Sequence, residues 1–375
     1  MPALPSPLSA EPLVRLEDLD LYRAGLEQHR AGAWDDERWT AFRVRFGIYG
    51  QRQPGVQMVR IKIPGGIVPV AWLRVLAHAN RTFAQGDAHV TTRQDLQIYH
   101  VPLERTPDLL ESLHRGGITT REACGNTVRN VNGCALAGFC PHERVDASRV
   151  AQGLALAWLR SPLTQNMPRK VKVAVSGCTA DCGATSIHDL GLIAVEQDGK
   201  PGFRVLAGGG LGSNPRPAVV LAEFVEESCL PAVMEALLRL HQRYSDRLNR
   251  NAARLKFVAH RFGADTFRAL FEEELQRLKP LPQRPWSPLS WRQPAEGAPP
   301  RLPVGVVAQH DGRRAVVITP TLGNVSSDQL DQLADIADRF AIAEARFTRE
   351  QNIVLVGVAS QSVVDVVAAV RALGQ

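Results

Sequence analysis

The feature of this chain that most restricts its fold is a pattern that occurs twice. Residues 90–101 read VTTRQDLQIYHV, and residues 347–358 read FTREQNIVLVGV. Three matches share one offset of 257 residues: Thr91 with Thr348, Gln94 with Gln351, and Val101 with Val358. A repeat predicts the same supersecondary unit in both places. We therefore predict an internal duplication; the alternative is two unrelated βαβ-like units.

Strands and a helix surround each copy of the pattern. In the first copy, VQMVRIKIP alternates apolar and polar residues as a half-buried strand does, and VAWLRVLAHANRTFA has helical spacing. AHVTT and LQIYHV follow as strands, and Pro107 opens a helix. In the second copy, AVVITP and ARFTREQNIVLVGV supply strands, and SSDQLDQLADIADRF is a helix with Ser326 or Ser327 as its N-cap. Each copy is predicted to be a small α+β module.

The region between the copies has a different pattern. It predicts helices over Ala147–Arg160, Leu230–Leu248 and Ala264–Leu278, and strands over Val171–Ser176, Leu190–Glu196 and Phe203–Ala207. We expect five segments: an N-terminal extension (1–40) that wraps or frays, a first module (41–115), a central α/β domain (116–280), a linker (281–303) and a second module (304–375). The linker is rich in proline, which favours a stiff, extended chain.

The composition is that of a globular protein. Hydrophobic residues make up 45% of the 375 and charged residues 22%, close to the average for soluble domains. No stretch approaches the roughly 18 uncharged apolar residues of a membrane span. The first twenty residues lack the pattern of a signal peptide, so we expect a cytoplasmic protein that does not bind a membrane. The net charge of +6 is not gathered into a Lys/Arg block, which argues against nucleic-acid binding.

Four of the six cysteines form two close pairs. Cys134 and Cys140 enclose five residues in CALAGFC, and Cys178 and Cys182 enclose three in CTADC. Because cytoplasmic thiols stay reduced, such clustering indicates metal ligation. Two pairs can hold zinc or an iron–sulfur cluster. The five-residue gap is long for zinc, and the small residues around both pairs leave room for a bulkier group, so the spacing favours 4Fe-4S; four unrelated buried thiols are the other alternative.

Basic and polar residues accompany the cysteine pairs. Lys170 and Lys172 share one face of a predicted strand, because side chains alternate along it, and Arg129 precedes the first pair. In the first module Lys62 alternates with Arg60, and HVTTRQDLQ carries a second alternating set: His89, Thr91, Arg93 and Gln97. Each residue alone is typical of a solvated surface. Together, near a metal site, they indicate a pocket for an anion.

A glycine-rich run, GGGLG at residues 208–212, raises the question of a nucleotide site. It matches neither the G-x-G-x-x-G fingerprint nor the P-loop, and no nicotinamide or flavin fingerprint occurs elsewhere. We expect a tight turn that packs against a cofactor or another strand. Electrons for a redox reaction would then come from an external donor.

Taken together, these motifs resemble one family. CALAGFC followed by CTADC is similar to the C-x5-C…C-x3-C signature of the sirohaem-dependent nitrite/sulfite reductases. RIKIPGG, HVTTRQDLQ, CGNTVRN and MPRKVKVAVSGC look like the other motifs of that family, in its order. The resemblance covers nearly all of residues 40–375. It implies an α+β fold with two ferredoxin-like half domains that flank a central sirohaem and 4Fe-4S module, and the family's second haem module is absent here.

The resemblance also implies roles for individual residues. Cys134, Cys140, Cys178 and Cys182 would hold the 4Fe-4S cluster, and Cys182 would also bridge to the sirohaem iron. Four basic residues would bind and protonate the oxyanion substrate: Arg129, Lys170, Lys172 and Lys62. The sirohaem carboxylates would be bound by His89, Thr91, Arg93, Gln97 and Arg169, with Arg254 and Lys256 as weaker candidates. Cys124 and Cys229 match no ligand position, and Cys124 is predicted to be a small buried hydrophobe.

The function that the resemblance implies is six-electron reduction of nitrite to ammonia or of sulfite to sulfide. A ferredoxin or a flavoprotein would be the electron donor, and a second subunit or a second copy would supply the missing haem module. The position of Lys62 is often Arg in the sulfite reducers, so the lysine of this chain is more like the residue of the nitrite reducers. Two alternatives are a precorrin-3B-synthase-like monooxygenase, against which the Lys170, Lys172 and Arg129 set argues, and a non-catalytic 4Fe-4S electron-transfer subunit.

Overall fold

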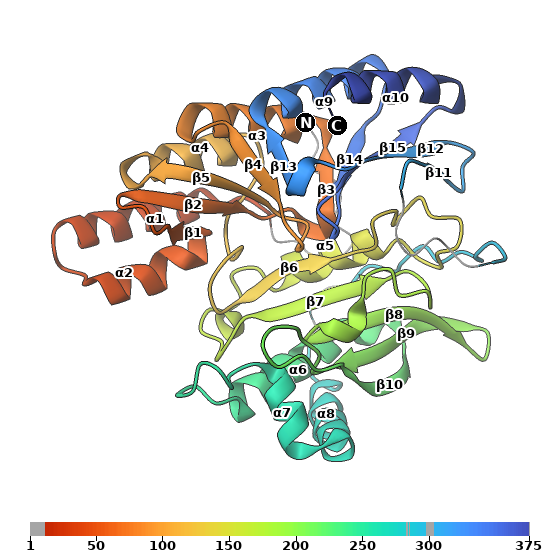
Figure 1. Cartoon of the computed structure of the whole chain (residues 1–375). Helices are drawn as coiled ribbons and strands as arrows, with labels where there is room; N and C mark the ends of the chain where they lie inside the picture. Colours follow the sequence, from red (N-terminus) through yellow and green to blue (C-terminus); the bar gives the residue numbers. More distant parts are fainter. Residues whose placement is uncertain (1–11, 283, 285, 298–303, 375) are drawn as a thin grey trace. The chain divides into compact units, whose positions relative to one another are not determined.

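The computed structural model describes residues 12–282, 284, 286–297 and 304–374 (Figure 1). Contacts divide these residues into two compact units. The duplicated unit consists of residues 12–125 and 304–374, and the cysteine unit consists of the described residues from 126 to 297. Helices and strands occur in both, as the predicted α+β class requires. Among the described helices, none is long and apolar enough to cross a membrane.

The duplicated unit contains two five-stranded antiparallel sheets with matching strand order. One has the order β1-β2-β5-β4-β13 and the other β11-β12-β15-β14-β3. The first copy supplies β1 (Ile48–Gly50), β2 (Val56–Ile61), β3 (Ile67–Pro69), β4 (Asp87–Val90) and β5 (Leu96–Pro102). The second supplies β11 (Val306–Ala308), β12 (Arg314–Ile318), β13 (Asn324–Ser326), β14 (Glu344–Phe347) and β15 (Ile353–Val358). Because the strands correspond at the offset of 257 residues, to within a residue or two, the predicted duplication is confirmed.

Each sheet takes one edge strand from the other copy. β3 pairs with β14 and joins Ile67 to Arg346, whereas β13 pairs with β4 and joins Asn324 to His89. Ile67 and Asn324 occupy equivalent positions in the two copies, and so do His89 and Arg346. Neither sheet is therefore complete without the other copy.

The turn after β4 and the turn after β14 have the same hydrogen bonds. The Thr91 N–H donates to the Asp95 carbonyl at 2.8 Å, and the Asp95 N–H donates to the Thr91 hydroxyl at 3.1 Å. The equivalent distances between Thr348 and Asn352 are 3.0 and 3.2 Å. Both turns place a glutamine at positive φ, Gln94 and Gln351. Two of the three matched pairs, Thr91 with Thr348 and Gln94 with Gln351, thus belong to the turn.

Helices from both copies pack together. α3 (Val70–Phe83) lies against α9 (Ser327–Arg339), and the Asn80 amide donates to the Ser327 hydroxyl at 3.0 Å. α9 begins after Ser326, which forms a capping box with Gln329, so the first of the two predicted N-caps is the one used. The remaining helices of these copies are α4 (Thr106–Arg115) and α10 (Val363–Ala372).

The N-terminal part of the duplicated unit differs from the predicted extension. It forms α1 (Leu16–Arg30) and α2 (Asp36–Arg43), which pack against each other. Their contact is an aromatic cluster of four buried side chains, Tyr22, Trp39, Phe42 and Phe46. These residues are spread over α1, α2 and the 3-10 turn Val44–Phe46, so no single window shows a strong apolar period. Residues 1–11 of the predicted extension lie outside the described residues.

The cysteine unit is built on one five-stranded sheet with the order β10-β9-β8-β7-β6. Its strands are β6 (Val128–Asn132), β7 (Val171–Ser176), β8 (Leu190–Gln197), β9 (Lys200–Ala207) and β10 (Val219–Val225). β6, β7 and β8 are parallel, and the others are antiparallel. α5 (Ala147–Ala157) packs on β6 and β7, and three helices pack as a group, α6 (Leu230–Tyr244), α7 (Leu255–Phe262) and α8 (Ala264–Leu278).

The proline-rich segment belongs with the cysteine unit. The Arg292 N–H donates to the Arg144 carbonyl at 2.8 Å, and the Ala295 N–H donates to the Pro141 carbonyl at 2.8 Å. The Trp291 indole donates to Glu227 at 2.5 Å. The division between the units falls after Gly125, ten residues beyond the end predicted for the first module. The predicted bounds of the five segments stay predictions, but this segment is anchored along its described length.

Candidate functional site

The two cysteine pairs follow two neighbouring parallel strands. Cys134 comes two residues after β6, and Cys178 comes two residues after β7. The ends of these strands are in register, since Asn132 pairs with Ala174. Because the carboxyl ends of parallel strands meet at one sheet edge, both cysteine loops start from the same edge. The fold thus brings together four thiols that are up to 48 residues apart in the sequence.

The electrostatics of the thiols show that they share one region. Burial raises the pKa of the Cys134 thiol well above its ordinary value, and repulsion from Cys182 and Cys178 adds to this effect. Burial also raises the pKa of Cys140 to about 12, with smaller contributions from Glu143, Cys178 and Cys182. Thiolates this close together in a desolvated place need bound positive charge. Metal ions supply it, because metal binding couples to deprotonation of the ligands.

Backbone N–H groups point at three of the sulfurs. The Gly177 N–H donates to the Cys134 sulfur at 3.4 Å. Backbone hydrogen bonds from His142 and Ala180 lower the pKa of the Cys140 and Cys178 thiols, and so favour the thiolates. Burial raises the pKa of both thiols and is the larger effect. Hydrogen bonds to cysteine sulfurs stabilise a reduced iron–sulfur cluster and tune its potential. The loops are therefore shaped for sulfurs that carry charge.

The donor set fits a cluster better than a single metal ion. All six cysteines are free thiols, so the four cysteines of the two loops are available as ligands. In a 4Fe-4S cluster each thiolate binds a different iron, so the sulfurs stand farther apart than around one tetrahedral ion. Small residues let the backbone come close: at Gly183 a Cβ would lie 2.7 Å from the Val175 carbonyl oxygen.

The predicted substrate-binding residues of this unit lie on the same strands. Val128 of β6 pairs with Val171 of β7, and both are buried. Arg129 and Lys172 are the next residues along these strands, and both are partly exposed. The β6–β7 ladder is irregular between Val128 and Val131, the stretch that contains Arg129, so strand alternation does not fix a common direction for Arg129 and Lys172. Lys170 lies two residues before Lys172, so these two side chains have the same direction if the strand pattern extends to Lys170. The shared face of Arg129, Lys170 and Lys172 stays a prediction, and so does their catalytic role.

Arg254 and Lys256 have structural partners. Arg254 donates to the buried Asp189 carboxylate through Nε at 3.1 Å and through a second nitrogen at 2.7 Å. Lys256 donates to the carbonyls of Leu211 and Asn214 at 3.1 and 2.5 Å. These contacts hold the GGGLG turn and the start of α7. Arg169, the remaining candidate, donates to the Asn126 side chain at 3.4 Å.

In the duplicated unit two of the predicted sirohaem ligands, Gln97 and His89, lie in a row across the sheet with Arg60 and Asn324. Arg60 pairs with Gln97, Gln97 with His89, and His89 with Asn324 of the exchanged strand β13. The side chains are linked as well: the Arg60 Nε donates to Gln97 at 2.9 Å, and His89 Nδ1 lies 3.0 Å from the Asn324 side-chain oxygen. His89 Nε2 is 2.7 Å from Gln351. The row is one polar face contributed by both copies.

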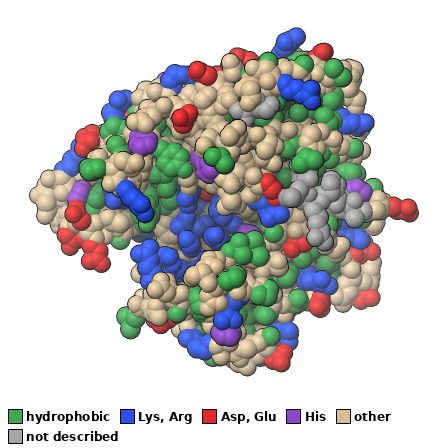
Figure 2. Space-filling view, in the orientation of Figure 1, with side chains coloured by type: hydrophobic (Ala, Val, Ile, Leu, Met, Phe, Trp, Pro, Cys, Tyr) green, Lys and Arg blue, Asp and Glu red, His purple; other side chains and the backbone are tan. Residues whose placement is uncertain are grey.

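Three predicted site residues of this unit are not part of this row: Thr91, Lys62 and Arg93. The Thr91 hydroxyl accepts the N–H groups of Arg93 and Asp95, so it shapes the turn. Lys62 follows β2 and is buried, with 1% of its surface exposed, and Arg93 is buried too. Figure 2 shows Lys and Arg side chains at many places on the face of the molecule that it draws. A set of cations and hydrogen-bond donors of this kind fits a polycarboxylate such as sirohaem.

Four further residues act at these sites without having been predicted, namely Arg60, Asp95, Glu143 and Asp189. The sequence indicated Arg60 through its alternation with Lys62 along one strand. The three acidic residues carry no local signal, because each is buried against partners that are distant in the sequence or on another element. Buried carboxylates are rare without such partners, and only the fold identifies the partners.

Glu143 lies beside the cluster loop and is paired with the proline-rich segment. It is 2% exposed, accepts the Gly138 N–H at 2.8 Å, and forms an ion pair with Arg292 at 3.0 Å. Its charge raises the pKa of the Cys134, Cys140 and Cys178 thiols as one of the smaller contributions, after burial. The Arg292–Glu143 pair therefore fastens the loop between Cys134 and Cys140.

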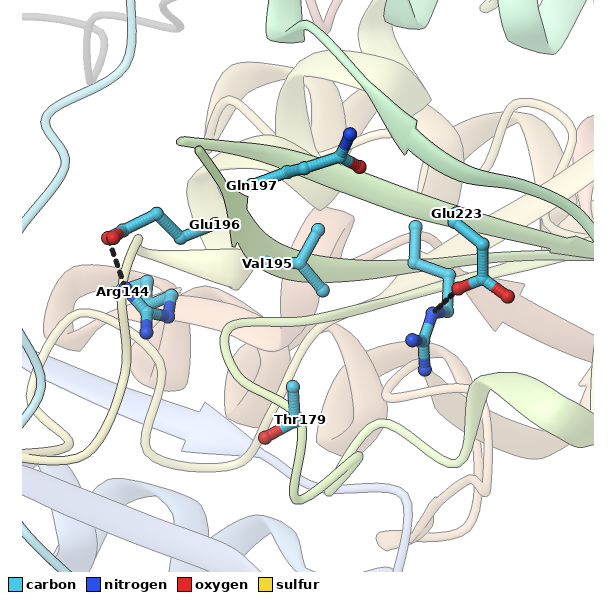
Figure 3. A pocket seen from close by; sticks show the side chains of 7 residues that line it. Arg144, Thr179, Val195, Glu196, Gln197 and Glu223 are labelled. Atoms are coloured by element: carbon cyan, nitrogen blue, oxygen red, sulfur yellow. Dashed lines mark hydrogen bonds and ion pairs between the residues drawn. The ribbon is translucent and has the colours of Figure 1, made fainter. Parts of the chain in front are cut away.

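A pocket of about 300 Å³ lies next to the second cysteine pair (Figure 3). Thr179, the neighbour of Cys178, lines it together with two ion pairs: Arg144 with Glu196 at 2.8 Å and Arg204 with Glu223 at 2.7 Å. Both pairs are partly exposed, so the lining carries no large net charge. The exposed Arg204–Glu223 pair of this pocket can serve as a control for the buried Arg292–Glu143 pair.

Replacing Arg292 by glutamine should destabilise the cysteine unit by about 1–3 kcal/mol, because the buried Glu143 carboxylate then lacks its charged partner. The matched change Arg204→Gln breaks an exposed pair and should cost roughly 0–1 kcal/mol. Urea denaturation midpoints of the two full-length variants measure the difference. Equal midpoints for both variants would contradict a fastening role for Arg292.

The fold and the site define a class of protein. Paired cysteine loops that favour a 4Fe-4S cluster, together with the basic residues Arg129, Lys170 and Lys172 on or beside the same strands, are typical of an iron–sulfur oxidoreductase. The profile described as "Nitrite and sulphite reductase 4Fe-4S domain" matches residues 124–279, and "Nitrite/Sulfite reductase ferredoxin-like half domain" matches residues 49–116 and 307–373. The chain belongs to the nitrite and sulfite reductase family, and membership implies a 4Fe-4S cluster and sirohaem as cofactors.

Individual relatives agree with this assignment. The chain is 31% identical to the assimilatory ferredoxin-dependent nitrite reductase of Haloferax mediterranei over 89% of this chain and 61% of that protein. It is 30% identical to the ferredoxin–nitrite reductase of Synechococcus elongatus, over 92% and 70%. The solved structure of the Mycobacterium tuberculosis NirA protein matches with a TM-score of 0.81 at 29% identity, over 97% of this chain and 70% of that one. The chain spans about three-fifths of the length of the first curated relatives.

Proposed function

We propose that this chain carries out the six-electron reduction of nitrite to ammonia or of sulfite to sulfide. The observation that carries the proposal is the meeting of both cysteine loops at the edge where β6 and β7 end, on the strands that also bear Arg129 and Lys172. Family membership supports it, since the matched relatives are named nitrite reductases and sulfite reductases. When bound, sirohaem and the 4Fe-4S cluster supply the redox chemistry of a reaction that takes its electrons one at a time.

The cysteine unit would hold the cluster and the substrate. Cys134, Cys140, Cys178 and Cys182 are the proposed cluster ligands, and Cys182 is the proposed link to the sirohaem iron. Arg129, Lys170 and Lys172 would attract the anion with fixed positive charge and hold protons near the oxygens that leave as water. A shared strand face would keep them oriented without reorganisation, which is what preorganised electrostatic stabilisation requires.

The duplicated unit would contribute cofactor contacts and a fourth substrate cation. His89 and Gln97 already belong to a hydrogen-bonded row, so their orientation is set before any ligand binds. Arg93 and Arg169 would pair with carboxylates of sirohaem, Thr91 would keep the turn in shape, and Lys62 would join the substrate group. Arg254 and Lys256 have structural partners in the cysteine unit, which makes them weaker candidates for cofactor contact.

The proposed electron donor is a ferredoxin, in line with the names of the matched relatives; a flavoprotein is the other donor class that the sequence left open. We place the reaction in the cytoplasm, where cysteines remain reduced and available to iron. A second subunit or a second copy that supplies another haem module remains a hypothesis that no comparison supports. The mass of the cofactor-loaded protein in solution would test it.

The test is a parallel steady-state assay of nitrite and sulfite with reduced methyl viologen, on full-length protein reconstituted anaerobically with iron, sulfide and sirohaem. We expect turnover of at least one anion and a product of ammonia or sulfide. Iron near four to five atoms per chain (an estimate from the cofactor set) should accompany it. A loaded protein that reduces neither anion would overturn the proposal. The comparisons do not favour the corrin-pathway monooxygenase or the electron-transfer subunit.

A further inference from the structure

Asp95 is a carboxylate in the interior of the duplicated unit. It is 1% exposed, and its Oδ1 accepts the N–H of Ile63 at 3.1 Å. Ile63 is the neighbour of Lys62, so this bond fixes the backbone from which the Lys62 side chain projects. The charged groups that act on Asp95 are Arg60, Lys62 and Arg93. The carboxylate thus lies among cations that include one proposed substrate residue and one proposed cofactor residue.

The second copy of the fold shows what this position needs for folding alone. The same turn has Asn352 in place of Asp95, with the same backbone hydrogen bonds and distances within about 0.2 Å. The carboxylate is therefore not required for the turn. The equivalent of Ile63 is Pro320, which has no N–H to donate.

The cations disappear from the second copy together with the carboxylate. The equivalents of Arg60, Lys62 and Arg93 are Val317, Thr319 and Glu350. The glutamine of each turn, by contrast, is kept at positive φ. Within one protein, the shared residues mark what the fold requires, and the carboxylate with its cations marks what the first copy adds.

The ionised carboxylate of Asp95 also lowers the stability of the folded protein, although the same turn folds with Asn352 in the second copy. Burial raises the pKa of its carboxyl to about 6, although Arg60, the Ile63 N–H, Lys62 and Arg93 all oppose the rise. The unfolded chain holds this proton less tightly, since an ordinary Asp titrates near 3.9. The folded protein is therefore destabilised as the pH rises from about 4 to about 6, and the cost persists above pH 6.

We propose that Asp95 is a positioning residue for the substrate-binding cations: it holds the backbone of Lys62 and sets the net positive charge of Arg60, Lys62 and Arg93. It touches no substrate. The inference rests on the proposed function and assigns a residue that none of the motifs singled out. Protonated Asp95 leaves this group at +3, and ionised Asp95 leaves it at +2. A substrate anion is attracted more strongly in the first state.

The expected consequence is a pH-dependent affinity for the anion. Nitrite is the better probe, because it remains an anion over the range from pH 5 to 7.5. In the wild-type protein the KM for nitrite should rise about three- to tenfold over this range, as Asp95 loses its proton, with kcat less affected. In Asp95→Asn the rise should be absent, and the KM should stay near the wild-type value at pH 5. The ratio of variant to wild type removes the effects of other titrating groups.

A matched control comes from the second copy. Asn352→Asp places a carboxylate in the same backbone turn, where the equivalents of Arg60, Lys62 and Arg93 are Val317, Thr319 and Glu350. It should leave the nitrite KM and its pH dependence unchanged. If this control flattened the pH profile as much as Asp95→Asn does, the effect would belong to the fold and the proposal would be overturned.

A second readout does not depend on activity. Urea denaturation of the full chain should show Asp95→Asn and wild type with nearly equal midpoints at pH 4. By pH 7 the variant should be the more stable protein, because wild type has lost stability on ionising Asp95. Equal midpoints at every pH would overturn the proposal, and so would an Asp95→Asn protein that fails to fold, since the carboxylate would then serve the fold. If wild type reduces neither anion, the proposed function fails, while this stability comparison still tests Asp95.

Discussion

Replacing Cys134 by serine should remove the iron–sulfur centre and reduce turnover of both anions to background. Burial raises the pKa of the Cys134 thiol well above its ordinary value, and Cys182, Cys178 and the Gly177 N–H all act on it. A neutral serine hydroxyl keeps the size of the side chain but cannot supply thiolate charge to iron. The iron content per chain and the visible absorbance of the reconstituted protein measure the loss.

The matched control for this change is Cys229→Ser. Cys229 belongs to the same unit and lies immediately before α6, outside both cysteine loops. We expect full iron content and unchanged turnover in this variant. Metal binding contributes to folding where the ligands are brought together by it, so Cys134→Ser should also lower the thermal midpoint. Full iron content in Cys134→Ser would remove this residue from the ligand set.

Replacing Asp189 by alanine should destabilise the cysteine unit by about 3–5 kcal/mol. Asp189 is fully buried and accepts three hydrogen bonds, two from the Arg254 guanidinium at 3.1 and 2.7 Å and one from the Lys172 N–H at 2.8 Å. Its loss leaves a largely buried guanidinium and a strand N–H without their acceptor. The free energy of unfolding from urea titrations measures the effect.

Two controls separate charge from packing at this position. Glu223→Ala breaks the exposed ion pair with Arg204 and should change the free energy of unfolding by roughly 0–1 kcal/mol. The double change Asp189→Leu with Arg254→Met replaces the buried pair by apolar side chains, and such replacements are often neutral. Because Asp189 binds the backbone of Lys172, Asp189→Ala should also raise the KM for the anion. A change below about 1 kcal/mol in Asp189→Ala would contradict the assigned role.

Much of the fold follows from periodicity. The strand over Val171–Ser176 and the helix over Ala264–Leu278 have the predicted bounds, because each has a strong apolar pattern with clear ends. α1, α2 and α7 were missed, since their buried residues are few or aromatic and are spread over short elements. The strand exchange between the copies was also outside the reach of the sequence, because pairing of distant strands leaves no local pattern.

The site was predictable in a similar, uneven way. Cysteine spacing was sufficient to group the four thiols, whereas the grouping of Arg129 with Lys172 stays a prediction, because the β6–β7 ladder is irregular between Val128 and Val131. The acidic partners were not predictable, because a buried carboxylate is defined by what surrounds it. Asp189 meets Arg254 across 65 residues, and Glu143 meets Arg292 across 149. Asp95 shows the limit best: its bond to Ile63 depends on an N–H that the equivalent Pro320 lacks.

The exchanged strands have a consequence for how such a fold could arise. A single copy, produced alone, would carry β3 with no sheet to join and a β4 edge with no strand beside it. An orphan strand and an open edge in one chain are complementary to those of an identical chain, which is the arrangement of a domain-swapped homodimer. The duplicated unit is thus the covalent form of a symmetric pair, and the cysteine unit occupies the tether between its halves, where an inserted domain leaves the pairing intact.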